Sequence, residues 1–199
     1  MRSRLLILIV GLAFAAVTPA LAGSSETGTS GVFSIGPGHS FVAWVPGADS
    51  TFVRTPNGIS ISLQTSSLPA GHAVTMWALI FNNPSACAGA CDESSGDLNI
   101  PEVMGSVQHV AGHVVGTHGS FAGHLTLGDA THTARGPGLL NPFGAEIHLI
   151  VRDHGVLNPD GVLGSLTDAF ITDQFNNDSP RFCNVACADI QKSVHLADA

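Results

Sequence analysis

The amino-acid sequence predicts an all-β protein, a single antiparallel sandwich or barrel of about nine or ten strands. Short β-prone runs alternate with turn residues from Val32 onward. Gly, Ser, Thr and Val are abundant, whereas charged residues make up only 11% of the chain, a mix that favours a turn-rich sheet over helices. No stretch carries a convincing helical stripe of apolar residues, and a short helical turn within 165–175 is the best helical candidate.

The expected strands follow one another in short steps. They cover residues 32–35, 41–45, 51–55, 59–64, 74–81, 107–115, 121–127, 147–151, a weaker run at 162–170, and 190–196. Pro56-Asn57-Gly58 predicts a tight hairpin between two of them, because Asn and Gly tolerate positive φ. The run Ile59-Ser60-Ile61-Ser62-Leu63 alternates strictly, so one face of this strand is expected to be buried and the other solvated.

The first 22 residues have the features of a cleavable secretory signal peptide. Arg2 and Arg4 give a positive start, 5–17 is apolar apart from Gly11, and Ala20 and Ala22 are small residues at the positions a signal peptidase reads. The apolar run is shorter than the roughly 20 residues that cross a bilayer, although an uncleaved anchor is the alternative. We therefore expect a secreted protein, periplasmic or extracellular, with no membrane span in the mature chain. Residues 23–30 are expected to be a flexible lead-in, and 31–199 the β domain.

The net charge of the chain is acidic. Seven basic and fifteen acidic residues give a formal charge of −8, and loss of Arg2 and Arg4 with the leader lowers it to −10. Phosphate backbones repel such a chain, so nucleic acid is not an expected partner. Ten histidines can each gain a proton between roughly pH 5 and 8, and we expect solubility or assembly to change on acidification.

Four cysteines form two C-x3-C motifs, Cys87 with Cys91 and Cys183 with Cys187. In an exported chain, four cysteines usually form two disulfides. Of the three possible connectivities we favour the two local bridges, because each loop is short and contains small residues. A zinc site built from all four cysteines is the alternative, although such sites typically use C-x2-C pairs in reducing compartments.

The histidines suggest a candidate metal site. A tight turn at 118–119 would place His113 opposite His124, with Cβ atoms about 5 Å apart. Farther along, His148 and Glu146 share one face of a strand, so His148 could be a third imidazole and Glu146 a fourth ligand or a residue that orients one. Three imidazoles suit zinc or copper. Ordinary surface or core histidines are the alternative, as are buried histidines that contact a non-metal ligand.

Three sequence blocks carry a resemblance to known proteins. The first contains Leu68, Gly71, Thr75, Trp77, Phe81-Asn82-Asn83-Pro84 and Cys87; the later ones are Gly144-Ala-Glu-Ile-His148 and Asp189-Ile-Gln-x-x-Val-His195. They resemble the T-x-W-x3-F-N-N-P-x2-C pattern and later blocks of an uncharacterised family of exported bacterial β proteins, over most of residues 50–197. The order of strand, small loop and histidine strand is also similar to chordin-type (CHRD) β domains, although their closing Gly-Glu-Ile-Arg-Gly block is missing. Neither resemblance implies a catalytic residue or a substrate.

No sequence motif of catalysis emerges. The chain has no G-x-S-x-G nucleophile elbow, no 12-residue calcium loop and no phosphate-binding loop before a helix. The leading expectation is a secreted, non-catalytic β domain with a binding or structural role, whose protein or small-molecule partner is unknown. A histidine-based metal-binding protein or metalloenzyme is the first alternative. A small-ligand carrier in a β-barrel is the second.

Overall fold

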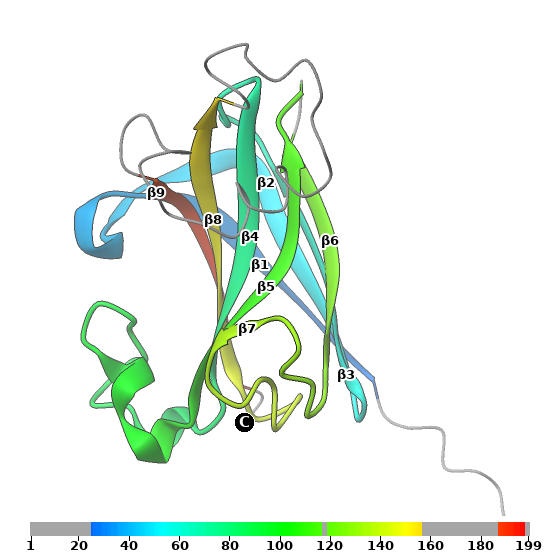
Figure 1. The fold of residues 1–199 in the computed structure, drawn as a ribbon, viewed down its shortest axis with the longest axis vertical. Coiled ribbons are helices and arrows are strands. Elements are labelled where there is room, and N and C mark those ends of the chain that lie inside the picture. The colour runs from blue at the N-terminus through cyan, green and yellow to red at the C-terminus, as the bar shows by residue number, and fades with distance from the viewer. Residues whose placement is uncertain (1–24, 117–118, 157–186, 198–199) are drawn as a thin grey trace, which may run out of the picture.

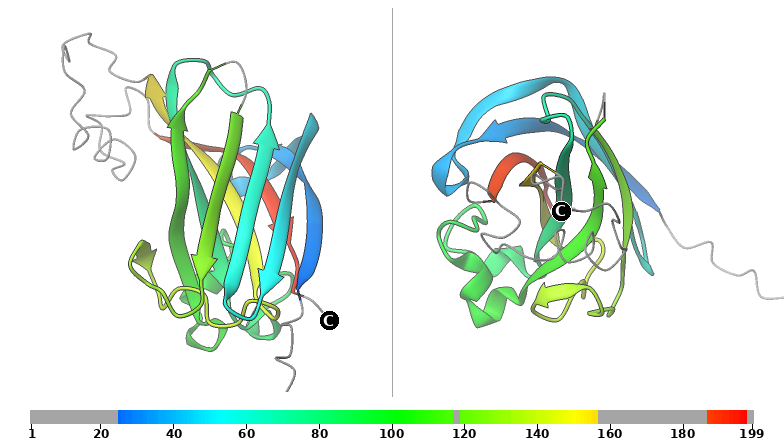
Figure 2. Two further views of the ribbon diagram at one scale, coloured as in Figure 1. Left: turned by 90° about the vertical axis from the view of Figure 1, so that its right-hand side faces the viewer. Right: turned by 45° about the horizontal axis from the view of Figure 1, so that its top comes forward.

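A computed structural model describes residues 25–116, 119–156 and 187–197 (Figure 1). Within them the chain forms one nine-stranded antiparallel sheet in the order β6-β3-β2-β1-β9-β8-β4-β5-β7, which curls into a half-barrel (Figures 1 and 2). The predicted all-β fold of about nine or ten antiparallel strands is therefore confirmed. Three predicted features lie outside the described residues: the leader, the weak strand at 162–170 and the helical turn within 165–175.

Nine strands and four single turns of 3-10 helix make up the described secondary structure. The strands are β1 (Glu26–Ile35), β2 (Phe41–Thr55), β3 (Gly58–Thr65), β4 (His72–Phe81), β5 (Gly105–Val114), β6 (Gly119–Thr126), β7 (Thr133–Arg135), β8 (Glu146–Val156) and β9 (Ala188–His195). The 3-10 turns are η1 (Pro37–His39), η2 (Pro84–Ala86), η3 (Asp97–Asn99) and η4 (Pro101–Val103). Within the described segments, no helix is long and apolar enough to cross a membrane.

The β2–β3 hairpin forms where the sequence predicts it. Thr55 pairs with Gly58 across the turn, and Gly58 has a φ of 151°, a backbone angle that residues other than glycine rarely adopt. Along β3, Ile59, Ile61 and Leu63 are buried whereas the serines between them are exposed. Local turn chemistry and period-two alternation therefore determine this part of the fold.

The first strand begins earlier than the sequence predicts. Glu26 pairs with Arg54 of β2, and the ladder continues without a break to the pair of Gly31 and Asp49. The flexible lead-in predicted for 23–30 is therefore wrong from Glu26 onward. The polar side chains of this stretch are exposed, and backbone hydrogen bonds to β2 hold it in place, which side-chain polarity alone does not reveal.

Apolar clusters cover both faces of strands β4 and β8. Inside the half-barrel lies a large buried cluster that includes Phe52, Ile59, Leu63, Met76, Ile80, Leu125 and Leu149. On the outer face, Leu79, Phe81 and Ile150 pack with Cys91 and Val103 from the 82–104 loop. Because both faces of these strands are apolar, the loop packs onto the outside of the sheet. It projects on the same side of the half-barrel as the tip of the β1–β2 hairpin, residues 36–40, which we call the β1–β2 tip (Figure 1).

Strands β5 and β6 approach each other without forming a ladder in the part of the chain that the structure describes. Gly123 of β6 lies against Val110 of β5, and a Cβ at Gly123 would collide with Val110. β5 pairs instead with β4 and β7, and β6 pairs with β3. The predicted hairpin that opposes His113 and His124 is therefore wrong, because parity along a strand fixes the shared face but not the neighbouring strand.

Candidate ligand-binding site

A pocket of about 340 Å³ lies on the outer face of the sheet, between the β1–β2 tip and the 82–104 loop. Its apolar lining consists of Trp77, Leu79, Leu98, Val107, Ala134 and Ile150. Its polar lining consists of His39, Glu93, Arg152 and Asp189. The volume lies at the lower end of the roughly 300–1,000 Å³ that small-molecule sites occupy.

Cross-strand pairing builds the floor of this pocket. Trp77 of β4 pairs with Ile150 of β8, and Ile150 in turn pairs with Lys192 of β9. Two residues farther along β4, Leu79 pairs with Val107 of β5 on one side and with His148 of β8 on the other. Directly opposed residues point to the same side of a sheet, so these two rows place an apolar surface beside a basic edge.

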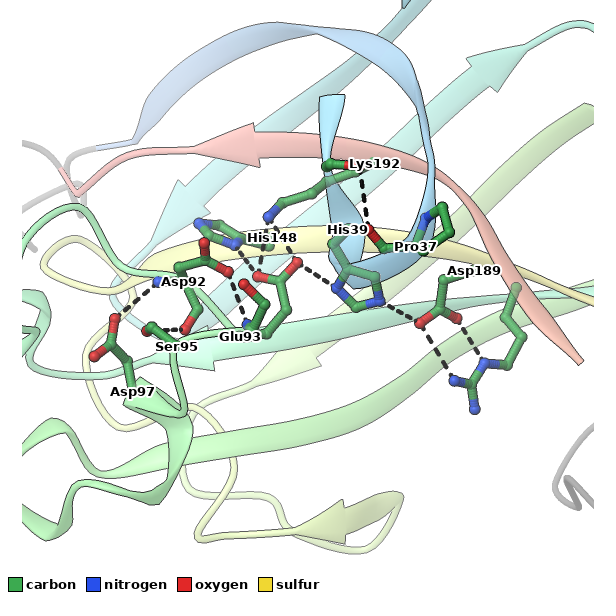
Figure 3. Close-up of polar contacts among 12 residues, drawn as sticks. Pro37, His39, Asp92, Glu93, Ser95, Asp97, His148, Asp189 and Lys192 are labelled. Atoms are coloured by element: carbon green, nitrogen blue, oxygen red, sulfur yellow. Dashed lines mark hydrogen bonds and ion pairs between the residues drawn. The ribbon is translucent and has the colours of Figure 1, made fainter. Parts of the chain in front are cut away.

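The carboxylate of Glu93 is the centre of the polar wall (Figure 3). Lys192 Nζ donates to both of its oxygens, at 2.7 and 2.9 Å. The Nδ1 atoms of His39 and His148 lie 2.6 and 2.9 Å from Glu93 Oε1 and Oε2. Glu93 therefore joins the 82–104 loop to the β1–β2 tip, to β8 and to β9.

The contacts continue outward from both imidazoles. His148 Nε2 lies 2.8 Å from Glu146 Oε1. On the other side, His39 Nε2 lies 2.6 Å from Asp189 Oδ2, and Arg152 Nε donates to Asp189 Oδ1 at 2.6 Å. We call the set the ion-pair chain. Its members are Glu146, His148, Glu93, Lys192, His39, Asp189 and Arg152.

The charge states of the buried centre follow from its hydrogen bonds. Both nitrogens of His148, which is 2% exposed, face carboxylates, and only an imidazolium donates to two acceptors. Burial lowers the pKa of His148, but hydrogen bonds to Glu146 and Glu93 outweigh it, so the pKa is raised above its ordinary value. Burial likewise raises the pKa of Glu93, but hydrogen bonds from His148 and Lys192 outweigh it and bring the pKa far below its ordinary value. The centre is thus an ionised carboxylate between cations.

His39 reaches the pocket from a strained backbone. Its φ is 57° and follows the φ of 67° at Gly38, so two successive residues lie in the left-handed region. A non-glycine residue there costs roughly 1–3 kcal/mol. The two contacts with Glu93 and Asp189 offset that cost and fix the imidazole between segments 54 and 150 residues away.

A disulfide shapes the loop that carries Glu93. Cys87 is bonded to Cys91, which confirms the first predicted bridge. The Asp97 carboxylate accepts hydrogen bonds from the backbone N–H of Asp92 at 2.9 Å and of Ala88 at 3.4 Å. Glu93 follows two residues after the buried Cys91, so bridge and hydrogen bonds together position its carboxylate.

The second predicted bridge, Cys183–Cys187, lies partly outside the residues that the structure describes. Cys183 is not among the described residues. Cys187 is disulfide-bonded, and its Sγ lies 3.6 Å from Nδ1 of the buried His154. The Nε2 of His154 in turn lies 2.7 Å from Thr75 Oγ1.

The structure brings together two of the four predicted metal ligands. Glu146 and His148 contact each other in the ion-pair chain. His113 pairs with Val74 of β4 and packs its ring 4.5 Å from that of Phe121. His124 is exposed, with Nδ1 3.3 Å from Ser60 Oγ. Across the described residues, no group of three or more His, Cys, Asp or Glu side chains is arranged to hold a metal ion.

Most of the pocket wall was not anticipated by the sequence. His39, Glu93, Asp189 and Lys192 come from three segments that only strand pairing and the packing of the 82–104 loop bring together. One signal was present: Glu146, His148, Ile150 and Arg152 alternate along one strand and therefore share a face. Glu93 directly follows a C-x3-C motif, which indicates a fixed loop but not what the loop contacts.

Comparison of the chain with protein-family models, with curated proteins and with solved structures finds no match. The resemblance drawn from the three sequence blocks stays a prediction. The site is therefore interpreted from its own chemistry.

Proposed function

We propose that this chain is a secreted, non-catalytic β domain that binds a small molecule in the pocket between the β1–β2 tip and the 82–104 loop. The observation that carries the proposal is the pairing of an apolar floor with a polar wall fixed by the ion-pair chain. A concave, largely apolar surface with a few held polar groups is the usual form of a ligand site.

The position of the pocket differs from the one that a small-ligand carrier in a β-barrel would use. Phe52, Met76 and Leu149 belong to the cluster that fills the interior of the half-barrel. The pocket lies instead on the outer face of β4, β5 and β8. A ligand would therefore rest against the barrel wall, in contrast to the carrier with an internal cavity that the sequence suggested.

The chemistry of the lining favours binding over catalysis. Both nitrogens of His39 face carboxylate oxygens, so neither is placed to take a proton from a substrate. Among the described residues that line the pocket, none is a serine, threonine or cysteine that His39 could activate.

Secretion is supported by the bridge beside the pocket. The Cys87–Cys91 disulfide is of a kind that persists in oxidising compartments and is rare in the cytosol. It agrees with the predicted leader, and we include export in the proposal.

A fragment screen against two matched variants tests this function. Ala134 is exposed and lines the pocket, so Ala134→Phe places a ring in the pocket without disturbing the core. Ala122 is also exposed but lies on β6, away from the lining, and Ala122→Phe is the control. Thermal-shift and ligand-observed NMR measurements should find fragments that bind the wild-type and Ala122→Phe proteins and not Ala134→Phe. Fragments that bind all three proteins alike, or none, would overturn the proposal.

A further inference from the structure

We infer that the ligand of this pocket is an uncharged, mainly apolar molecule with a planar ring body. The inference rests on the proposed binding function and adds the chemical class of the ligand. Three features support it. The charged groups of the polar wall contact one another, the indole N–H of Trp77 already donates a hydrogen bond within the protein, and the pocket is small.

Each charged group of the polar wall already contacts a partner within the ion-pair chain. Glu93 accepts hydrogen bonds from Lys192 and contacts two imidazoles, while Asp189 contacts His39 and Arg152. The three carboxylates of the ion-pair chain already face the Lys192 ammonium, the Arg152 guanidinium and the imidazoles of His39 and His148. A charged ligand would have to replace one of these contacts and leave its former partner buried without a counter-charge, which is costly. An uncharged ligand carries no such cost.

The indole of Trp77 is fixed on the floor of the pocket. Its Nε1 donates to Thr75 Oγ1 at 2.8 Å, so its one hydrogen-bond donor is already used. Its ring also meets that of His109 in a T-shaped contact at 5.2 Å. Because these contacts hold the ring, Trp77 offers a ligand an aromatic surface at little loss of side-chain freedom, which favours a planar partner.

The remaining floor is aliphatic. Leu79, Val107, Ile150 and Leu98 present only carbon to the pocket. A volume of about 340 Å³ admits a body of roughly two or three rings. The lining therefore selects a ligand by its shape and by the apolar surface that it buries. The ion-pair chain borders the pocket without offering an unpaired charge to the ligand.

A second apolar surface must be separated from the pocket in any binding test. Phe33, Phe41 and Trp44 pack their rings 5.3 to 5.6 Å apart on β1 and β2, and Phe41 and Trp44 are 54% and 62% exposed. An aromatic probe could also adsorb there. Trp44→Phe removes that indole and leaves Trp77 as the one tryptophan, so tryptophan fluorescence then comes from Trp77 alone.

Three probes that share one ring body decide the ligand class. N-phenyl-1-naphthylamine is uncharged, 1-anilinonaphthalene-8-sulfonate adds an anionic group, and a trimethylammonium derivative of the same body adds a cation. In the Trp44→Phe background the uncharged probe should quench Trp77 and bind at least ten-fold more tightly than either charged probe. Ala134→Phe should weaken its binding at least ten-fold, whereas Ala122→Phe should not, with denaturation curves confirming that each variant folds.

Two outcomes overturn the inference. If a charged probe binds as tightly as the uncharged one and Ala134→Phe weakens it, the ligand class is wrong while the proposed pocket function stands. If binding is insensitive to Ala134→Phe but lost in Phe41→Ser, the probe occupies the exposed aromatic cluster and the inference fails. The proposed function is then decided separately by the fragment screen.

Discussion

His39 Nδ1 lies 2.6 Å from Glu93 Oε1, although the two residues are 54 positions apart in the sequence. This contact joins the β1–β2 tip to the 82–104 loop and forms one side of the pocket. The same imidazole contacts Asp189 of β9, so a single side chain connects three segments.

Replacing His39 by glycine tests that connection. His39→Gly removes both carboxylate contacts and also relieves the left-handed backbone strain, so the two effects partly cancel. We expect the free energy of unfolding to fall by about 1–2 kcal/mol in urea denaturation. Amide exchange at residues 38–41 should accelerate. His132→Gly, at an exposed turn, is the control, and equal losses in the two variants would contradict a role for His39 as a connector.

Lys192 and Glu93 should be strongly coupled. Lys192→Met leaves the buried carboxylate with fewer cations, and we expect a loss of about 3 kcal/mol in the free energy of unfolding. Glu93→Gln removes the charge that Lys192 neutralises, so the double variant should lose less than the sum of the two single losses, by at least about 1 kcal/mol. Urea unfolding of the four proteins measures this coupling, and simple additivity would show that the pair contributes no mutual stabilisation.

The His148 contribution to stability should depend on pH with a defined sign. Because the pKa of His148 is raised above its ordinary 6.5, its stabilisation is complete below about pH 6.5 and is lost as pH rises through the folded-state pKa. The pKa of Glu93 is lowered from 4.5, so its stabilisation is present above about pH 4.5 and is lost in acid. The difference in unfolding free energy between wild type and His148→Gln should therefore be largest between pH 5 and 6. A difference that grows steadily above pH 7 would contradict this arrangement.

His195 should act in the opposite direction. Burial, together with the positive charge of Arg54, lowers the pKa of His195 to about 4. Its ring stacks on Phe52 at 3.6 Å, and its Nε2 lies 2.7 Å from Ser50 Oγ. As pH falls, His195 gains a proton near pH 6.5 in the unfolded state but only near pH 4 in the folded state. The free energy of unfolding therefore decreases by about 3 kcal/mol as pH falls through that interval. His195→Gln should remove this part of the acid sensitivity, and an unchanged pH slope would exclude His195 as its source.

The Cys87–Cys91 bridge should matter more for the pocket than for global stability. A bridge across so short a loop restricts the unfolded chain little, so Cys87→Ser with Cys91→Ala should lower the free energy of unfolding by only about 1–2 kcal/mol. Affinity for N-phenyl-1-naphthylamine should fall several-fold, because Glu93 is no longer held. Hydrogen exchange across 88–100 provides an independent measurement. Unchanged affinity together with faster exchange would show that the loop does not control the site.

The local features of the fold were accessible from the sequence. Pro56-Asn57-Gly58 and the alternation of Ile59 through Leu63 are encoded within a few residues, and both are confirmed. Parity along β8 likewise places Glu146 and His148 on one face, where they contact each other. Each of these inferences needs only the geometry of one strand or one turn.

The assembly of the site could not be inferred in the same way. Its charged members converge because β9 pairs with β8 and because the 82–104 loop folds over the outer face, and both are long-range events. The pairing expected for His113 and His124 failed for the same reason, since the partner of β5 proved to be β4. Sequence spacing carries little information on which strands become neighbours.

The position of β9 in the sheet has a consequence for folding. β9 follows the other eight described strands along the chain, yet it lies between β1 and β8. Until β9 inserts, the other eight described strands can pair only as two separate pieces with unpaired edges at β1 and β8, and such edges invite pairing with other chains. A protein that lost its residues from Ala188 onward would lose Asp189 and Lys192 from the site and would also face this hazard permanently, so we expect it to aggregate.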